Sequence, residues 1–142
     1  MADTPWYDLK ITYTLIGALI SLTTFFVTQV LTNKREEKKM LQTLLYSLVQ
    51  GHGALFSIIY IGALDEDKLD YLSLRKELLK TGGFVNILPV DIKEDFNTLY
   101  LIHTSDNDYY LKNKNKIHPL LKSIINKIVK YGGKAFGYKP IQ

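Results

Sequence analysis

The chain has 142 residues, a formal net charge of +4 and no cysteine. This length is typical of a single domain, and the lack of cysteine excludes disulfides, thiolate metal ligands and a thiol nucleophile. Only two of the 18 basic residues, Arg35 and Arg75, are arginine. Lysine is a hydrated point charge, whereas arginine is the planar fork that reads phosphates and bases. The charge therefore indicates general attraction to anionic surfaces rather than sequence-specific nucleic-acid recognition.

The longest apolar stretch, residues 11–31, comes almost first. It reads ITYTLIGALISLTTFFVTQVL, and no charged residue lies between Lys10 and Lys34. As a helix it would be about 31 Å long, close to the ~30 Å hydrocarbon core of a bilayer. A cleaved signal peptide would have a basic start, a shorter apolar core and a small-residue cleavage site. A buried helix of a soluble protein rarely lacks charges over so long a run. We therefore predict a transmembrane helix at 11–31.

The orientation of this helix follows from the basic residues at its two ends. Only Lys10 precedes it, and a charged juxtamembrane segment, residues 32–40, follows with Lys34, Arg35, Lys38 and Lys39. Because basic residues are retained on the cytoplasmic side, we predict a single-pass protein of the cell (inner) membrane. Residues 1–10 would form an external tail, and residues 32–142 would be cytoplasmic. Trp6, Tyr7 and Tyr13 would then lie at the outer interface.

Small and hydroxyl side chains recur along one side of the predicted transmembrane helix. Those that define the stripe are Thr14, Gly17, Ser21, Thr24 and Thr28. Small residues allow membrane helices to approach closely, so the stripe is a candidate helix-packing face of a homo-oligomer. Alternatively, the hydroxyl groups bond to carbonyl groups four residues earlier in their own helix. Both interpretations stay open.

From residue 41 the apolar residues follow the helical period of 3.6. They predict an amphipathic helix over residues 37–63, weakened at residues 51–53, which read Gly-His-Gly. The alternative is a second transmembrane segment at 41–64, because its later half is apolar nearly all round. Gln42, Gln50 and His52 oppose this alternative, since polar groups are costly in lipid. His52 lies on the apolar face, where a packed core residue is expected rather than a ligand.

A short helix is predicted next, over residues 68–80, after an acidic turn at 65–67. Its expected apolar stripe is Leu69, Leu72, Leu78 and Leu79, and two glycines at 82–83 supply a natural end. Residues 84–88 are apolar and precede Pro89, which disfavours helix for the residue before it. We expect an extended segment there.

The following segment allows two predictions. Asp91 as N-cap with Glu94 three residues later resembles a capping box, and apolar residues recur at helical spacing, which favours a helix over 92–103. Alternatively, residues 98–104 and 109–114 form a β-hairpin around the polar turn 105–108. We favour the helix.

The last helix is predicted from Pro119 to Lys130, because proline suits the first turn of a helix. Its expected apolar face is Leu120, Leu121, Ile124, Ile125, Ile128 and Val129. The glycines at 132–133 end it. The predicted helical cytoplasmic domain is therefore 41–133, followed by a flexible tail at 134–142.

Two groups of residues resemble functional sites. His103 with Asp106 and Asp108 is a weak signal for acid–base or metal chemistry, and a solvated turn explains it better. Six lysines form a candidate patch for an anionic ligand or lipid: Lys112, Lys114, Lys116, Lys122, Lys127 and Lys130. With Tyr109 and Tyr110 nearby, nucleic acid or a nucleotide is a weaker possibility. No catalytic, cofactor-binding or metal-binding set is predicted.

These patterns predict an all-α chain with one membrane helix and a small helical domain, or an α+β domain if residues 98–114 form a hairpin. The expected function is a non-enzymatic interaction or assembly subunit that holds a protein partner at the inner face of the membrane. The alternative is a small oligomeric membrane effector or toxin, whose cytoplasmic domain senses a protein or an anionic ligand.

Overall fold

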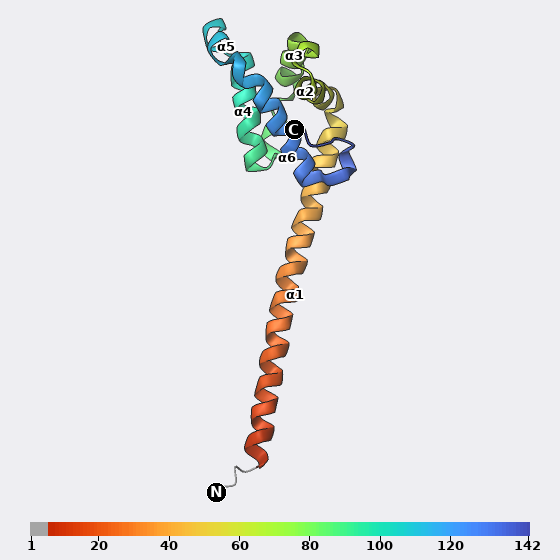
Figure 1. Ribbon diagram of the computed structural model, residues 1–142, viewed down its shortest axis with the longest axis vertical. Coiled ribbons are helices and arrows are strands. Elements are labelled where there is room, and N and C mark those ends of the chain that lie inside the picture. The colour runs from red at the N-terminus through yellow and green to blue at the C-terminus, as the bar shows by residue number, and fades with distance from the viewer. Residues whose placement is uncertain (1–5) are drawn as a thin grey trace. The chain divides into compact units, whose positions relative to one another are not determined.

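Helices make up the whole of the regular structure that the computed structural model describes (Figure 1). It describes the backbone of residues 6–142 and the side chains of residues 9–133 and 135–142. The chain divides into two compact units, Met1–Lys39 and Met40–Gln142. The prediction of an all-α chain is confirmed, and the alternative hairpin at 98–114 is absent from this described part.

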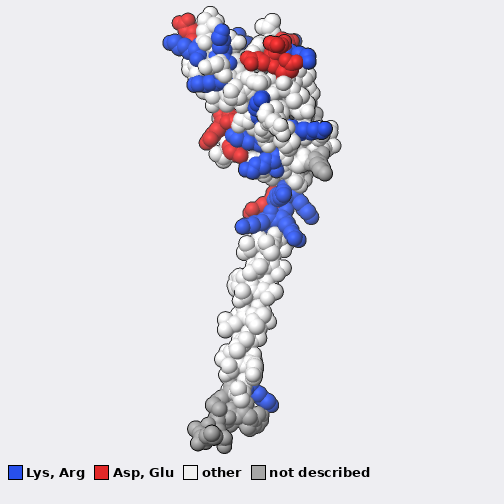
Figure 2. Space-filling model, viewed as in Figure 1, with Lys and Arg blue, Asp and Glu red and all other residues white. Residues whose placement is uncertain are grey.

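Helix α1 (Trp6–Gly51) contains the entire apolar stretch. Among the described residues, Leu9–Gly51 is the one segment long and apolar enough to cross a membrane, and its best window has a mean hydropathy of 1.8. None of that window is buried, whereas the core helix of a soluble protein would be mostly buried. Figure 2 shows its uncharged surface bounded by basic side chains. The side chains of Trp6 and Tyr7 lie outside the described residues, as do residues 1–5.

Helix α1 ends where the sequence predicted a weakness. His52 separates Gly51 from α2 (Gly53–Leu64), with φ of −122° and ψ of 34°. The imidazole of His52 stacks on the Phe84 ring at 4.3 Å between centroids, so it packs in the domain as expected. Leu55, Phe56 and Ile59 of α2 are completely buried. Because α2 has 12 residues and lies in the core, it does not form the alternative second membrane segment.

The predicted helix at 68–80 begins later than expected. Residues Glu66–Lys68 form a 3₁₀ turn, and α3 is Tyr71–Thr81. Asp70 caps α3, because its carboxylate accepts hydrogen bonds from the backbone of Leu72 at 3.1 Å and of Ser73 at 3.2 Å. The predicted apolar stripe was wrong at two positions. Leu72 and Leu79 face solvent, and Leu74 is buried in their place beside Leu78.

Two predictions around Pro89 were also wrong. Residues Phe84–Ile87 form a 3₁₀ turn, so only Leu88, with ψ of 152°, is extended as proline requires. Helix α4 (Val90–Thr104) starts directly after Pro89, which takes the N-cap position. Asp91 therefore lies inside the first turn and forms no capping box. The prediction of a helix at 92–103 is confirmed.

The chain ends in two further helices and a short packed segment. Helix α5 (Asn107–Asn113) and a 3₁₀ turn (Lys114–Lys116) lead into α6 (Ile117–Gly132), and Gly133 ends α6 with a φ of +59° that favours glycine. Another 3₁₀ turn follows at Gly133–Phe136. The tail differs from the flexible segment we expected, because Ile141 and Asn126 form two hydrogen bonds of 2.7 and 3.0 Å.

The domain core forms around α2 and α6, with α3 against α2 and α4 against α6. Gly62 permits the close approach of α2 and α6, since a Cβ atom there would lie 2.9 Å from Leu121 and 2.5 Å from Leu69. Three aromatic rings from α2, the turn after α3, and α4 meet edge to face in this core. They are Phe56, Phe84 and Phe96.

Candidate functional site: a cavity around His103

The helical domain leaves the Nε2 atoms of two histidines, His103 and the half-buried His118, without a hydrogen-bond partner among the described residues, and His103 is the more deeply buried of the two. His103, in the last turn of α4, is only 4% exposed. Its Nε2 atom has no hydrogen-bond partner among the described residues. A buried polar atom left in this state costs about 1–3 kcal/mol, so it needs an explanation.

Burial also determines the charge of this imidazole. Burial, acting together with the weaker effect of the nearby positive charge of Arg75, lowers the pKa of His103 to about 4. The ring is therefore neutral at pH 7. As a neutral ring, it can place either a proton or a lone pair on Nε2.

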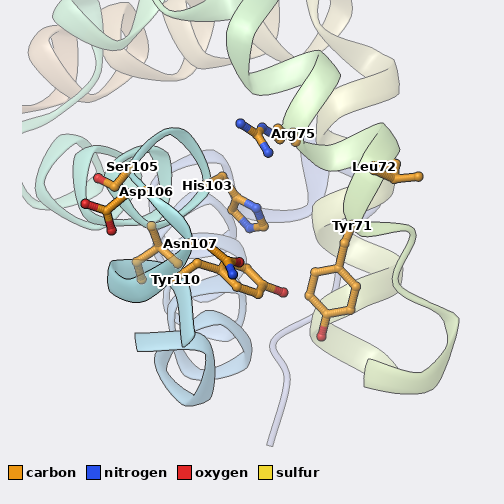
Figure 3. Close-up of a pocket in the computed structure, with 9 residues that line it drawn as sticks. Tyr71, Leu72, Arg75, His103, Ser105, Asp106, Asn107 and Tyr110 are labelled. Atoms are coloured by element: carbon orange, nitrogen blue, oxygen red, sulfur yellow. The ribbon is translucent and has the colours of Figure 1, made fainter. Parts of the chain in front are cut away.

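His103 lines a partly open cavity of about 450 Å³. Helix α3 contributes Tyr71 and Arg75 to its wall, and the start of α5 contributes Asn107 and Tyr110. Figure 3 shows Arg75 beside the His103 ring, with the Tyr71 and Tyr110 rings on its other side. The centroid of the His103 ring lies 6.3 Å from that of Tyr71 and 6.0 Å from that of Tyr110.

His103, Asp106 and Asp108, the weak signal in the sequence, have different surroundings in the structure. Asp106 caps α5, because its Oδ1 accepts a hydrogen bond from the backbone of Tyr109 at 2.8 Å. Asp108 is exposed in the first turn of α5. Among the described residues, no three His, Asp or Glu side chains are grouped so that they could hold a metal ion.

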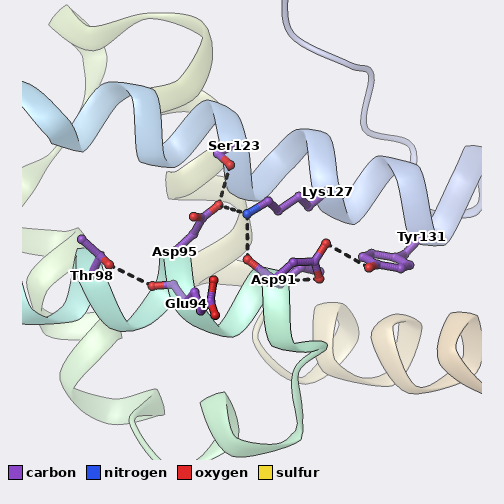
Figure 4. A network of polar contacts seen from close by, with 8 residues as sticks. Asp91, Glu94, Asp95, Thr98, Ser123, Lys127 and Tyr131 are labelled. Atoms are coloured by element: carbon purple, nitrogen blue, oxygen red, sulfur yellow. Dashed lines mark hydrogen bonds and ion pairs between the residues drawn. The ribbon is translucent and has the colours of Figure 1, made fainter.

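The six lysines of the candidate anionic-ligand patch differ in their exposure and in their hydrogen-bond partners. Lys127 is removed from the patch by an internal network (Figure 4), in which its ammonium group lies 2.6 Å from Asp95 and donates to the Asp91 carbonyl at 2.7 Å. Ser123 donates to the same Asp95 carboxylate. Lys122 donates to the Gln142 carbonyl at 3.0 Å. The four exposed members are Lys112, Lys114, Lys116 and Lys130.

The Asp91 end of this network includes a tyrosine from the last turns of α6. The Tyr131 hydroxyl donates to Asp91 at 2.9 Å, and this hydrogen bond raises the pKa of Tyr131. The network therefore joins α4 to α6.

In the predicted stripe of α1, the hydroxyl groups bond within their own helix. Thr14 donates to Lys10, Ser21 to Gly17, Thr24 to Ile20 and Thr28 to Thr24, at 2.8–2.9 Å. This arrangement is the alternative that the sequence left open, and helix packing along the stripe stays a prediction. The juxtamembrane residues Lys34, Arg35, Lys38 and Lys39 are exposed on α1.

The solvent-facing side of α3 was not predicted from the sequence. Leu72 is 80% exposed and Leu79 is 55% exposed, and seven residues of helix place both on the same side. Three cations occupy positions between and beside them: Arg75, Lys76 and Lys80. We call these five residues the α3 outer face. The signal in the sequence was that this helix carries more leucines than one buried stripe can hold, so two of them had to face solvent.

Comparisons of this chain with protein family models, with curated proteins and with solved structures found no match.

Proposed function

We propose that this protein is a non-enzymatic membrane-anchored interaction subunit, whose helical domain holds a protein partner at the inner face of the membrane. The exposed leucines of the α3 outer face are the observation that carries the proposal. Apolar side chains grouped on a surface and bordered by charge are typical of interaction sites.

The charges around these leucines indicate the kind of partner. Arg75, Lys76 and Lys80 favour an acidic segment, and an amphipathic helix fits a surface with leucines at helical spacing. Lys80 also pairs with Glu77 of α3 at 2.9 Å, so Arg75 and Lys76 supply most of the attraction. The proposed partner therefore presents a helix with an apolar stripe and acidic flanks.

An anionic lipid surface fits this part of the domain less well. Just before α3 the chain carries four carboxylates: Asp65, Glu66, Asp67 and Asp70. Negative lipid headgroups would repel these groups when α3 lay on the bilayer. An acidic helix of limited length can contact the leucines and cations without covering that cluster.

The anchor supports the membrane part of the proposal. The 11–31 stretch matches the bilayer in length, and the basic residues after it favour a cytoplasmic domain. The chain has no cysteine, so single-cysteine variants of the full protein give clean labelling.

We expect Ala2→Cys to react with a membrane-impermeant thiol reagent in intact cells, because the N-terminus would lie outside. A matched Lys112→Cys variant in the domain would react only after lysis. The reverse pattern would contradict the orientation.

We expect Leu79→Glu to weaken partner binding about 10-fold or more, because the carboxylate would be desolvated against acidic groups of the partner. The full-length protein would be extracted in mild detergent and its stoichiometric partner identified by mass spectrometry, followed by titration of the purified pair. Leu111→Glu, on α5, is the matched control, since Leu111 is 53% exposed. Equal binding by both variants, or a bound segment that is not acidic, would overturn the proposal.

An experiment in liposomes distinguishes a protein partner from the membrane surface as the group that covers the α3 outer face. A Leu79→Cys variant should react with a thiol reagent at the same rate in liposomes with and without anionic lipid. Protection confined to anionic liposomes would show that the α3 outer face lies on the leaflet instead.

A further inference from the structure

The cavity around His103 has the features of a ligand site, and it shares Leu72 and Arg75 with the α3 outer face. Most of its polar groups come from two helices that are distant in sequence, α3 and α5, with His103 of α4 between them. Its volume of about 450 Å³ falls within the range of small-molecule pockets.

One wall of the cavity carries a positive charge without a described counter-ion. Arg75 is exposed, and no ion pair joins it to a carboxylate among the described residues. Its guanidinium group lies close enough to His103 to lower the pKa of the imidazole. A guanidinium group binds carboxylate and phosphate through two parallel hydrogen bonds.

His103 complements this charge from inside the cavity. As the Nε2–H tautomer, the neutral ring would donate one hydrogen bond to an anionic oxygen. That bond would satisfy the polar atom that the domain leaves unpaired. An anion between Arg75 and His103 would therefore pair with the guanidinium group and satisfy the buried Nε2 atom together.

The opposite wall is aromatic. The ring centroids of Tyr71 and Tyr110 lie 6.3 and 6.0 Å from the centroid of the His103 ring, and both residues line the cavity. Burial raises the pKa of Tyr71, and the negative charge of Glu66 acts in the same direction, so its phenol stays neutral. Aromatic rings at this spacing favour a flat ring through stacked or edge-to-face contacts. Asn107, on the same wall, can bond to polar edges of such a ring.

We propose that this cavity binds a small molecule in which a planar ring carries a carboxylate or phosphate group. Arg75 and His103 hold the anionic group, and Tyr71 and Tyr110 hold the ring. An aromatic carboxylate and a nucleoside monophosphate share this chemistry, and the experiment distinguishes them.

The test titrates the full-length protein in detergent with benzoate, adenosine 5′-monophosphate, adenosine and inorganic phosphate, using isothermal calorimetry. At least one of the two ring-bearing anions should bind, and the tighter of them identifies the ligand class. Adenosine lacks the negative charge and would lose a charge-assisted hydrogen bond, whereas inorganic phosphate lacks the ring and would lose the stacking contact. Each should therefore bind at least about 10-fold more weakly than the tighter ring-bearing anion.

Variants assign the binding to this cavity. Arg75→Gln and Tyr110→Leu should each weaken the bound probe about 10-fold, and both residues are accessible enough to be replaced without loss of the core. Lys76→Gln is the matched control, because it removes a neighbouring charge of α3 outside the cavity. Equal effects of Lys76→Gln and Arg75→Gln would overturn the proposal, as would failure of all four probes to bind.

A second measurement reports on His103 itself. The bound anion should raise the pKa of the imidazole, as followed by NMR, because it opposes the effect of Arg75. The other titratable groups that line the cavity are Asp106 and the phenols of Tyr71 and Tyr110. No change in the His103 titration at saturating probe would place the ligand elsewhere.

Discussion

Replacing Phe96 with alanine is expected to destabilise the helical domain by about 3–5 kcal/mol, the largest effect of any single substitution considered for this chain. The Phe96 ring is completely buried. It meets Phe84 at 5.5 Å and Phe56 at 6.3 Å between centroids, so its loss opens a cavity among three segments of the chain. The thermal midpoint, followed by near-ultraviolet circular dichroism of the full protein in detergent, should fall by more than about 10 °C.

Leu111→Ala is the control for this prediction, since more than half of Leu111 is exposed and its truncation leaves no buried cavity. Its midpoint should stay within a few degrees of the parent. A Phe96→Ala protein with an unchanged midpoint would show that the Phe96 ring does not pack against Phe56 and Phe84 as described.

Lowering the pH from 7 to 4 is expected to remove up to about 3 kcal/mol of stability through His103 alone. The folded state holds the pKa of His103 at about 4, whereas an unfolded imidazole has a pKa near 6.5. Between these values the unfolded state binds more protons, so stability falls as the pH falls. From about one unit above pH 6.5 the imidazole is neutral in both states and contributes no pH dependence.

A His103→Phe variant isolates this contribution. Thermal unfolding across pH 4–7 should show a flatter pH dependence in the variant than in the parent. The carboxylates of Asp65 and Asp70, whose pKa values are lowered by hydrogen bonds to Lys68 and Ser73 respectively, are the same in both proteins and cancel in the comparison. Identical pH profiles would show that His103 is not buried as a neutral ring.

The sequence alone determined the local features of this chain that arise from short-range chemistry. The uncharged run at 11–31 defined the candidate membrane helix through its length and composition. Helical spacing identified Leu121, Ile124, Ile125 and Ile128 of the buried face of α6, because periodicity depends only on the backbone geometry of the helix. The other two predicted members, Leu120 and Val129, are partly buried. The Gly-His-Gly sequence marked the break between α1 and α2 for the same local reason.

Choices among chemically similar residues depended on tertiary contacts. Leu72, Leu74, Leu78 and Leu79 are equally apolar, and the position of α2 decided which two are buried. Lys127 resembled the other lysines until α4 placed Asp95 beside it. The cavity likewise requires Arg75, His103 and Tyr110, which are far enough apart in sequence that only folding brings them together.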